Sequence, residues 1–119
     1  MQDCKVNILG TEYNIKFKND EEVCADMGVG IGDCGGYCNG FSHEIVIANL
    51  NCCNDGETAK NNLKKTNMRH EITHAFLNES GLDANASDTD CWAKNEEMVD
   101  WFAIQSPKIY KAFNEVGAL

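Results

Sequence analysis

Long apolar runs are missing from this sequence of 119 residues. A membrane-spanning helix needs about 20 consecutive apolar residues, and no stretch of the chain approaches that length. The first ten residues, MQDCKVNILG, also lack the basic start and apolar core of a secretory signal peptide. We therefore expect a soluble, cytoplasmic protein that has no membrane partner.

Basic residues are scarce as well. Lys and Arg together number 10 against 19 Asp and Glu, which gives a formal net charge of -9. Binding to nucleic acid depends on positive side chains that neutralise phosphates, so the sequence predicts no nucleic-acid partner. The acidic balance instead favours a basic protein or a basic region of one.

Histidine occurs three times and proline once. The rest of the composition, 43% hydrophobic and 24% charged, is typical of a globular protein, and the length is sufficient for one hydrophobic core. No internal repeat divides the chain. We expect a single domain over residues 1–119, present as a monomer.

Cysteine, in contrast, is abundant, with seven residues in the chain. The number is odd and no export signal precedes them, so we expect reduced thiols that pack as small apolar side chains rather than a disulfide framework. An alternative is a second metal site made from Cys34, Cys38, Cys52 and Cys53. Its C-x3-C spacing and vicinal pair are not standard for a zinc ribbon.

The first half of the chain shows the alternating pattern of strands. Apolar residues occupy every second position between Val6 and Phe17, with a break at Gly10, and this predicts two paired strands. Residues 28–40 hold six of the ten glycines, which indicates a loop that leads into a hairpin. The β-branched stretch at residues 43–48 then predicts another strand.

The second half changes to helical spacing. Residues 58–80 carry one apolar stripe and are followed by Gly81, which predicts a long helix that ends there. A polar connection over residues 83–90 leads to a second helix that reaches residue 106. Pro107 is placed to begin a final helix, because proline is tolerated in a first helical turn. Strands followed by helices define an α+β fold with a small, mostly antiparallel N-terminal sheet.

The long helix contains the sequence His70-Glu71-Ile72-Thr73-His74, an H-E-x-x-H motif. Residues four apart share a helix face, so both imidazoles can bind one metal ion while Glu71 lies beside them. About 0.004 such motifs are expected by chance from the His and Glu content of this chain, which makes coincidence a poor explanation. The alternative is an ordinary solvated helix face. The motif predicts one catalytic Zn²⁺ per chain, with Glu71 as the general base.

A catalytic zinc usually has three protein ligands, so the motif needs a third. His43 is one candidate. Glu96 is the better one, because it lies on the next helix together with Asp100, one turn later on the same face. There Glu96 would complete the metal site, and Asp100 would accept the outward N–H of a ligating histidine. Glu97 would point elsewhere, and the alternative is that these acidic residues only face solvent.

The motif and the glutamate 22 residues after His74 resemble the gluzincin metallopeptidases, in which a later helix supplies the third ligand. The similarity to small phage and prophage zinc metallopeptidases extends over nearly the whole chain. It rests on the stretches ILGTEYNIKF, GGYCNGFSHEIVI, MRHEITHAFLNESGL and NEEMVDWFAIQSPKIYKAF. This resemblance implies a minimal zincin-like domain and peptide-bond hydrolysis.

Carried over by position, the resemblance implies zinc ligands at His70, His74 and Glu96. It implies a general base at Glu71 and a supporting carboxylate at Asp100. The implied partner is an intracellular protein or peptide substrate. The chain itself is expected in the cytoplasm, either as a protein of the bacterial host or as one encoded by a phage.

The residue that stabilises the transition state is less clear from the sequence. Gluzincins usually supply a downstream His or Tyr, but no His follows His74, and Tyr110 is the only Tyr after it. Tyr37 and His43 are equally open candidates. Arg69, next to the motif, could orient a substrate carboxylate, but a salt bridge at the helix surface is the simpler expectation.

The resemblance also gives a function to the strand at residues 43–48. Zincin folds place a sheet edge along the active-site cleft, where an extended peptide can pair with the strand through backbone hydrogen bonds. The alternative is a plain core strand. The residues expected to form this substrate edge are Glu44, Ile45, Val46 and Ile47.

Two other classes of function compete with the peptidase. The first is a metal-binding regulatory or adaptor domain of a phage or prophage, with weak catalysis or none. The second is a hydrolase that applies the same zinc chemistry to a bond other than a peptide. Since a fold does not determine a function, only a measured activity separates the three.

Overall fold

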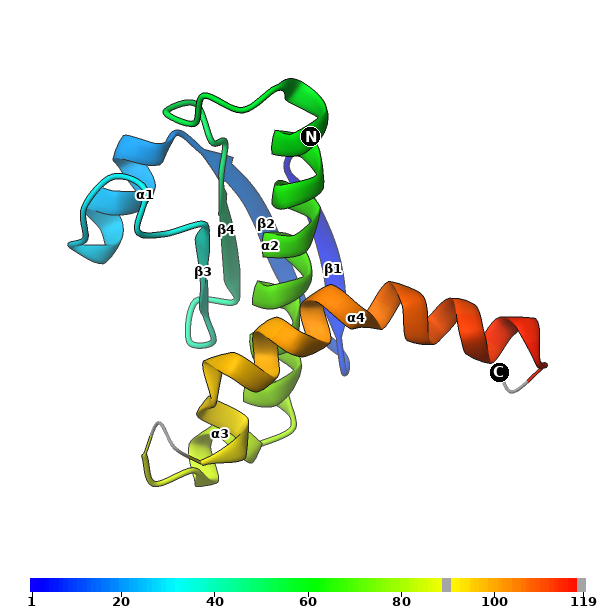
Figure 1. Ribbon diagram of the computed structural model, residues 1–119. Helices are drawn as coiled ribbons and strands as arrows, with labels where there is room; N and C mark the ends of the chain where they lie inside the picture. The colour runs from blue at the N-terminus through cyan, green and yellow to red at the C-terminus, as the bar shows by residue number, and fades with distance from the viewer. Residues whose placement is uncertain (89–90, 118–119) are drawn as a thin grey trace.

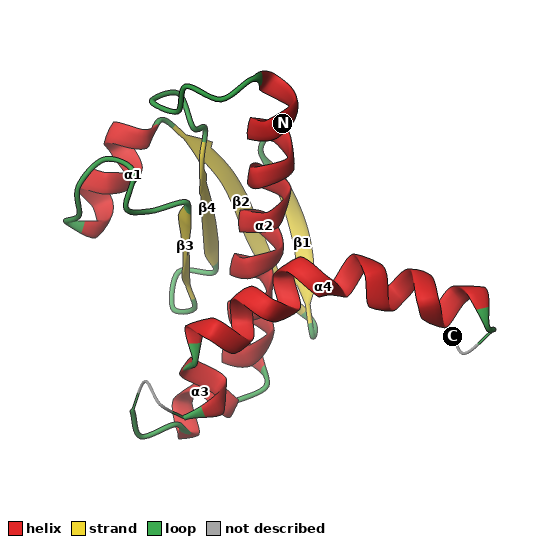
Figure 2. Cartoon of the chain, viewed as in Figure 1, coloured by secondary structure: helices red, strands yellow, loops and turns green. Residues whose placement is uncertain are grey.

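A four-stranded sheet and one long helix form the centre of this protein, as a computed structural model shows for residues 1–88 and 91–117 (Figures 1 and 2). The sheet occupies the first half of the chain and the longer helices the second, so the predicted α+β fold is confirmed. The elements are β1 (Cys4–Ile8), β2 (Thr11–Lys18), α1 (Asp20–Met27), β3 (Gly36–Asn39), β4 (Glu44–Ala48), α2 (Glu57–Glu79), α3 (Leu82–Asn85), a 3-10 turn (Trp92–Lys94) and α4 (Glu96–Glu115).

The strands lie in the order β1-β2-β4-β3. β1 and β2 are antiparallel, as are β3 and β4, whereas β2 and β4 are parallel. The predicted strand pair around Gly10 is therefore β1–β2. Its two-residue turn has positive φ at Leu9 (50°) and Gly10 (95°), the combination that matches the twist of a tight hairpin.

The position of β4 corrects one expectation. Residues 44–48 lie between β2 and β3, so Glu44, Ile45, Val46 and Ile47 belong to an inner strand and not to the substrate edge. The edge strand is β3. The apolar run from Ile45 to Ala48 is buried throughout, as is typical of a strand covered on both faces.

Helices cover the two faces of the sheet. Ile45 and Ile47 of β4 pack with Ala75 of α2 on one face. Val46 and Ala48, which alternate with them, pack with Val23 of α1 on the other. Figure 1 shows that α2 lies on the sheet and runs in roughly the same direction as the strands. This packing fixes which side of α2 is turned toward the protein and which sides remain for other contacts.

Helix α1 was not among the predicted elements, although the sequence carries its end signals. Asn19 stands at its N-cap, three acidic residues fill its first turn, and Gly28 closes it with φ 68°. The buried Asp20 side chain accepts the backbone N–H groups of Leu50 at 2.8 Å and Cys52 at 2.9 Å. Asp20 thereby ties α1 to the segment that follows β4.

The predicted long helix is confirmed within one residue at each end. α2 runs from Glu57 to Glu79, and Gly81 follows it with φ 80°. Met68, Ile72 and Ala75 of the predicted stripe pack against the sheet. Phe76 does not join them: it is 42% exposed and lies beside an apolar hollow between α2 and α4.

Helix α4 corrects a second expectation, because it continues through Pro107 instead of ending before it. Proline has no N–H, so the carbonyl of Ala103, four residues earlier, lacks its usual helical donor. Arg69 of α2 supplies one, with its Nε 2.5 Å from that carbonyl oxygen. Arg69 also donates to the Thr66 hydroxyl at 3.1 Å, so it bridges two helices where a surface salt bridge was expected. The N-terminal half of α4 packs on α2, and the C-terminal half projects from the body (Figure 1).

No helix in the described ranges 1–88 and 91–117 is both long and apolar enough to cross a membrane.

The bridge from Arg69 to Ala103 gives a prediction about stability. Replacing Arg69 by Ala leaves a partly buried carbonyl without a donor, which should cost about 1–3 kcal/mol of unfolding free energy. In a Pro107→Ala background the residue at 107 has its own N–H for that carbonyl, so Arg69→Ala should cost less there. Urea unfolding of the four proteins, with metal removed, measures the coupling. An equal cost in both backgrounds would contradict this explanation of the uninterrupted helix.

Candidate metal centre

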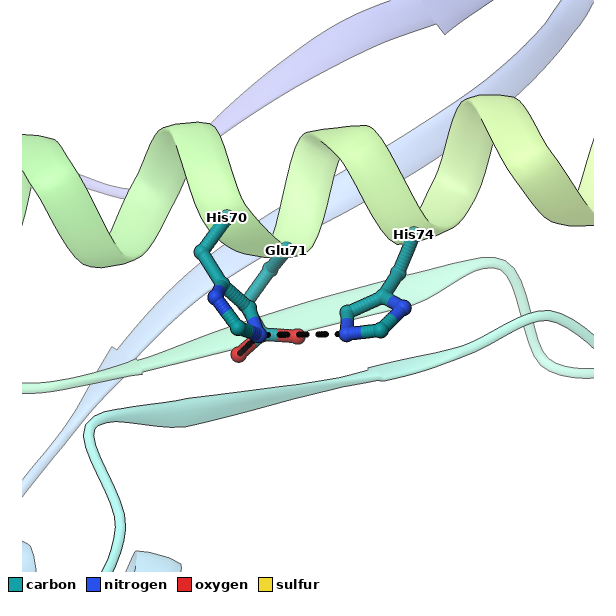
Figure 3. Close-up of side chains that lie close together, drawn as sticks. All are labelled: His70, Glu71 and His74. Atoms are coloured by element: carbon teal, nitrogen blue, oxygen red, sulfur yellow. Dashed lines mark hydrogen bonds and ion pairs between the residues drawn. The ribbon is translucent and has the colours of Figure 1, made fainter. Parts of the chain in front are cut away.

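Two helices bring the predicted site residues together. His70, Glu71 and His74 project from one side of α2, toward β3 and β4 (Figure 3). Glu96 and Asp100 come from the first turns of α4, which begins at the Asn95 cap, where the Asn95 side chain accepts the N–H of Met98 at 2.8 Å. This cap sets the rotation of α4, because it fixes which residue opens the first turn.

Three potential ligand atoms meet between the helices. The Nε2 atoms of His70 and His74 are 3.1 Å apart. A carboxylate oxygen of Glu96 lies 3.1 Å from Nε2 of His70, and Glu96 lies 3.3 Å from Nε2 of His74. Tetrahedral zinc ligands at roughly 2.0–2.2 Å from the ion lie about 3.3–3.6 Å from one another. The triangle formed by the three side chains is therefore close to one face of a zinc coordination tetrahedron.

The second nitrogen of His70 determines which tautomer faces this triangle. Nδ1 of His70 lies 2.7 Å from Oδ1 of Asp100. A carboxylate accepts, so Nδ1 of the neutral ring carries the proton and Nε2 presents a lone pair toward His74 and Glu96. A lone pair directed at a carboxylate and a second imidazole nitrogen is the arrangement that a cation stabilises. Asp100 is thus placed as the sequence predicts for a supporting carboxylate.

Glu71 differs from the other carboxylates in its burial. It is 7% exposed, and its Oε1 lies 4.0 Å from Nε2 of His70. Burial raises the pKa of Glu71 to about 7; His70 opposes this shift, whereas Glu96 and Asp100 add to it. Glu71 thus stands beside the ligand triangle, farther from His70 than Glu96 is, in a poorly hydrated position.

The residues present therefore fit a metal ion. His70, Glu71 and His74 offer ligand atoms that all lie within 4.8 Å of one another, and Glu96 closes the arrangement from α4. Two imidazoles with a carboxylate are a donor set that suits zinc and other transition metals better than calcium or magnesium. The helix phase predicted from the sequence is correct, since Glu96 faces the histidines and Glu97 is exposed outside the cavity.

His70, Glu71, His74 and Glu96 line a cavity of about 820 Å³. Its floor is α2, one wall is the loop before β3 together with β3 and the turn after it, and α3 and α4 form the other wall. Three glycines let the β3 wall approach the helix closely, since a Cβ atom on any of them would collide with a neighbouring residue. Gly35 abuts Asn67, Gly40 abuts Asn78, and Gly36 lies between them, where its Cβ would meet the Val46 carbonyl and lie 3.4 Å from Glu71.

Tyr110 and His43, two of the candidate transition-state residues, do not line this cavity. Tyr110 is 63% exposed on the C-terminal half of α4. His43 packs against the Tyr13 ring and lies 3.8 Å from a carboxylate oxygen of Glu79. Tyr37 does border the cavity, but its hydroxyl donates to Asp26 at 2.8 Å. The expected role of Tyr110 is therefore not supported by its position.

The cysteines form no second metal group among the described residues. All seven are free thiols, and His70, Glu71 and His74 are the one set of three or more ligating side chains that gathers there. Cys34 and Cys38 border the cavity instead. Burial raises the pKa of Cys38 to about 12, with Glu71 and Asp83 adding to the shift, so this thiol stays protonated.

The sequence interpretation missed the polar residues that extend the site along α2. Asn67, His74 and Asn78 recur at i, i+7 and i+11, the spacing of one helix face, so the stripe through the motif was available as a signal. Asn67 Nδ2 reaches the Gly35 carbonyl at 3.5 Å, and Asn78 Nδ2 reaches Cys38 Sγ at 3.9 Å. These contacts connect the helix to the edge strand.

The geometry predicts how strongly each acidic residue supports metal binding. Glu96→Ala removes one of the three potential ligands and should weaken zinc affinity sharply. Asp100→Ala should cost about 10- to 100-fold, as is usual for a group that orients a ligand. Glu97→Ala is the matched control and should leave affinity unchanged. Competition with a chromophoric chelator measures all three, and a larger loss for Glu97 than for Glu96 would contradict the placement of α4.

Comparisons of the chain with known protein families, with curated proteins and with solved structures found no match in any of the three. A function for this site is therefore inferred from its own residues.

Proposed function

We propose that this protein is a zinc-dependent peptidase. The observation that carries the proposal is the convergence of His70, His74 and Glu96 at 3.1–3.3 Å from one another, with the buried Glu71 beside them in one open cavity. Three ligands that leave a fourth position open are characteristic of catalytic zinc, whereas structural zinc is enclosed by four protein ligands. The resemblance of the motifs to gluzincins supports the same conclusion.

Each side chain has a distinct role in the proposed reaction. A zinc ion bound there supplies Lewis acidity, which polarises a carbonyl and makes a water molecule more acidic. Glu71 accepts the proton of the attacking water and delivers it to the leaving amine, which its unligated carboxylate can do. Asp100 holds the ring of His70 in the tautomer that presents Nε2.

The edge strand β3 is the proposed docking place for the substrate backbone. Ala48 N–H donates to the Gly35 carbonyl at 2.9 Å, and residues of an antiparallel strand alternate between facing their partner and facing outward. Gly36 and Cys38 thus direct their backbone groups to the open edge, where the Gly36 carbonyl accepts the Cys34 thiol at 2.9 Å. An extended peptide added there would run alongside α2 and pass the metal ligands.

The resemblance to small phage and prophage peptidases favours a cytoplasmic protein or peptide of a bacterial host. A metal-binding regulatory domain remains the alternative, and the activity of one variant distinguishes the two.

That variant is Glu71→Gln. It keeps the size of the side chain and all three proposed ligands but removes the proton acceptor, so zinc content and thermal stability should stay near those of the parent. Turnover of a peptide library should fall at least ~10²-fold, mainly in kcat. His74→Ala should lose metal and activity together.

Tyr110→Phe serves as the control, because Tyr110 lies outside the cavity, and its kcat should equal that of the parent. Zinc-loaded Glu71→Gln protein that cleaves as fast as the parent would show that Glu71 is not the base. Absence of any zinc-dependent cleavage by the parent would instead favour the regulatory domain.

A further inference from the structure

The cavity that holds the proposed metal ligands is strongly acidic. Five carboxylates line it, and neither Lys nor Arg does so among the described residues. Glu96 and Asp100 face the histidines, and Glu71 is buried beside them. A bound divalent cation would offset two of these three negative charges. Two further carboxylates, Asp33 and Asp83, are not accounted for by the metal centre.

Neither Asp33 nor Asp83 has a hydrogen-bond or salt-bridge partner for its side chain within the part of the chain that the structure describes. Asp33 is exposed in the loop before β3, and Asp83 is half-buried in α3. A carboxylate at the rim of a cavity with no cation beside it is available to a positive group of a ligand. The net charge of -9 extends the same field over the whole molecule.

The two aspartates lie at opposite ends of the site. Asp33 is two residues from Gly35, which abuts Asn67, whereas α3 with Asp83 follows the end of α2 near Asn78. Eleven residues of α-helix separate Asn67 from Asn78, a rise of about 16 Å. An extended peptide covers that distance with about five residues. His70 and His74 lie between the two ends.

We propose that the cavity selects peptide segments that carry Lys or Arg on both sides of the bond to be cut, with Asp33 contacting one basic side chain and Asp83 the other. This substrate class rests on the proposed peptidase function. The basic residues are expected two or three positions from the scissile bond on each side, as the separation of the aspartates requires. A polyanionic or acidic segment is excluded by the same charges.

The test uses the zinc-loaded full chain and three matched eight-residue peptides. They share one apolar centre and carry Lys, Gln or Glu at both flanking positions. We expect kcat/KM to fall in the order Lys, Gln, Glu, with at least ~10-fold between the first and the last. Asp33→Asn and Asp83→Asn should each reduce the preference for Lys about 2- to 10-fold, because each removes one charge contact.

Glu97→Gln is the matched control, since it removes the same charge from α4 outside the cavity, and it should leave the order unchanged. Equal cleavage of the three peptides would overturn the proposal. An effect of Glu97→Gln as large as that of Asp83→Asn would also overturn it, because net charge and not the cavity would then set the preference.

A binding measurement separates this inference from the peptidase proposal. Fluorescence anisotropy of the same peptides, labelled, is recorded with zinc-loaded Glu71→Gln protein. Preferential binding of the Lys peptide that Asp33→Asn and Asp83→Asn weaken, without cleavage by the parent, would leave the ligand class standing and reject the peptidase. Cleavage without charge preference in either assay would reject the ligand class alone, and no binding and no cleavage would reject both.

Discussion

The contact between α2 and α4 is the interaction on which the candidate site depends. The histidines lie on one helix and Glu96 with Asp100 on the other, so the ligand triangle exists only while the two helices are packed together. Leu77 of α2, Ala93 and Val99 form the small apolar core of this contact. The sheet packs against another face of α2. One face of α2 thus packs on the sheet, a second packs on α4, and a third carries His70, Glu71 and His74.

Two adjacent residues of α2, Arg69 and His70, both contact α4. Arg69 is adjacent to His70, and it bonds the carbonyl that Pro107 leaves without a helical donor. The residue that holds α4 in place is thus next to the residue whose ring α4 orients through Asp100. A shift of α4 along α2 would disturb the Arg69 bridge and the His70 contact together, so structure and site are mechanically coupled at one turn of helix.

The spacing of residues along the sequence predicted correctly how side chains within a single helix are oriented relative to one another. The rotation of His70 relative to His74, and of Glu96 relative to Glu97, follows from 3.6 residues per turn and is correct. The substrate edge was wrong because strand order depends on pairings between distant segments, which alternation within residues 44–48 does not reveal. The predicted end of the helix before Pro107 was wrong, because Arg69 of α2 supplies the donor that the Ala103 carbonyl would otherwise lack. Helix α1 was missed although Asn19 and Gly28 marked its ends.

A metal ion bound by His70, His74 and Glu96 would join α2 to α4, because its ligands lie on both helices. An ion that binds only the native arrangement stabilises it by mass action, so metal binding would increase the stability of the contact between α2 and α4. Without an ion, the two helices are held by their small apolar core, by the Arg69 bridge and by the hydrogen bond between His70 and Asp100. Opening there would uncover Leu77 and Val99, which the contact buries, and would make the segment accessible to proteases. If the proposed metal binds, the resistance of this protein to proteolysis should therefore rise with the concentration of free metal.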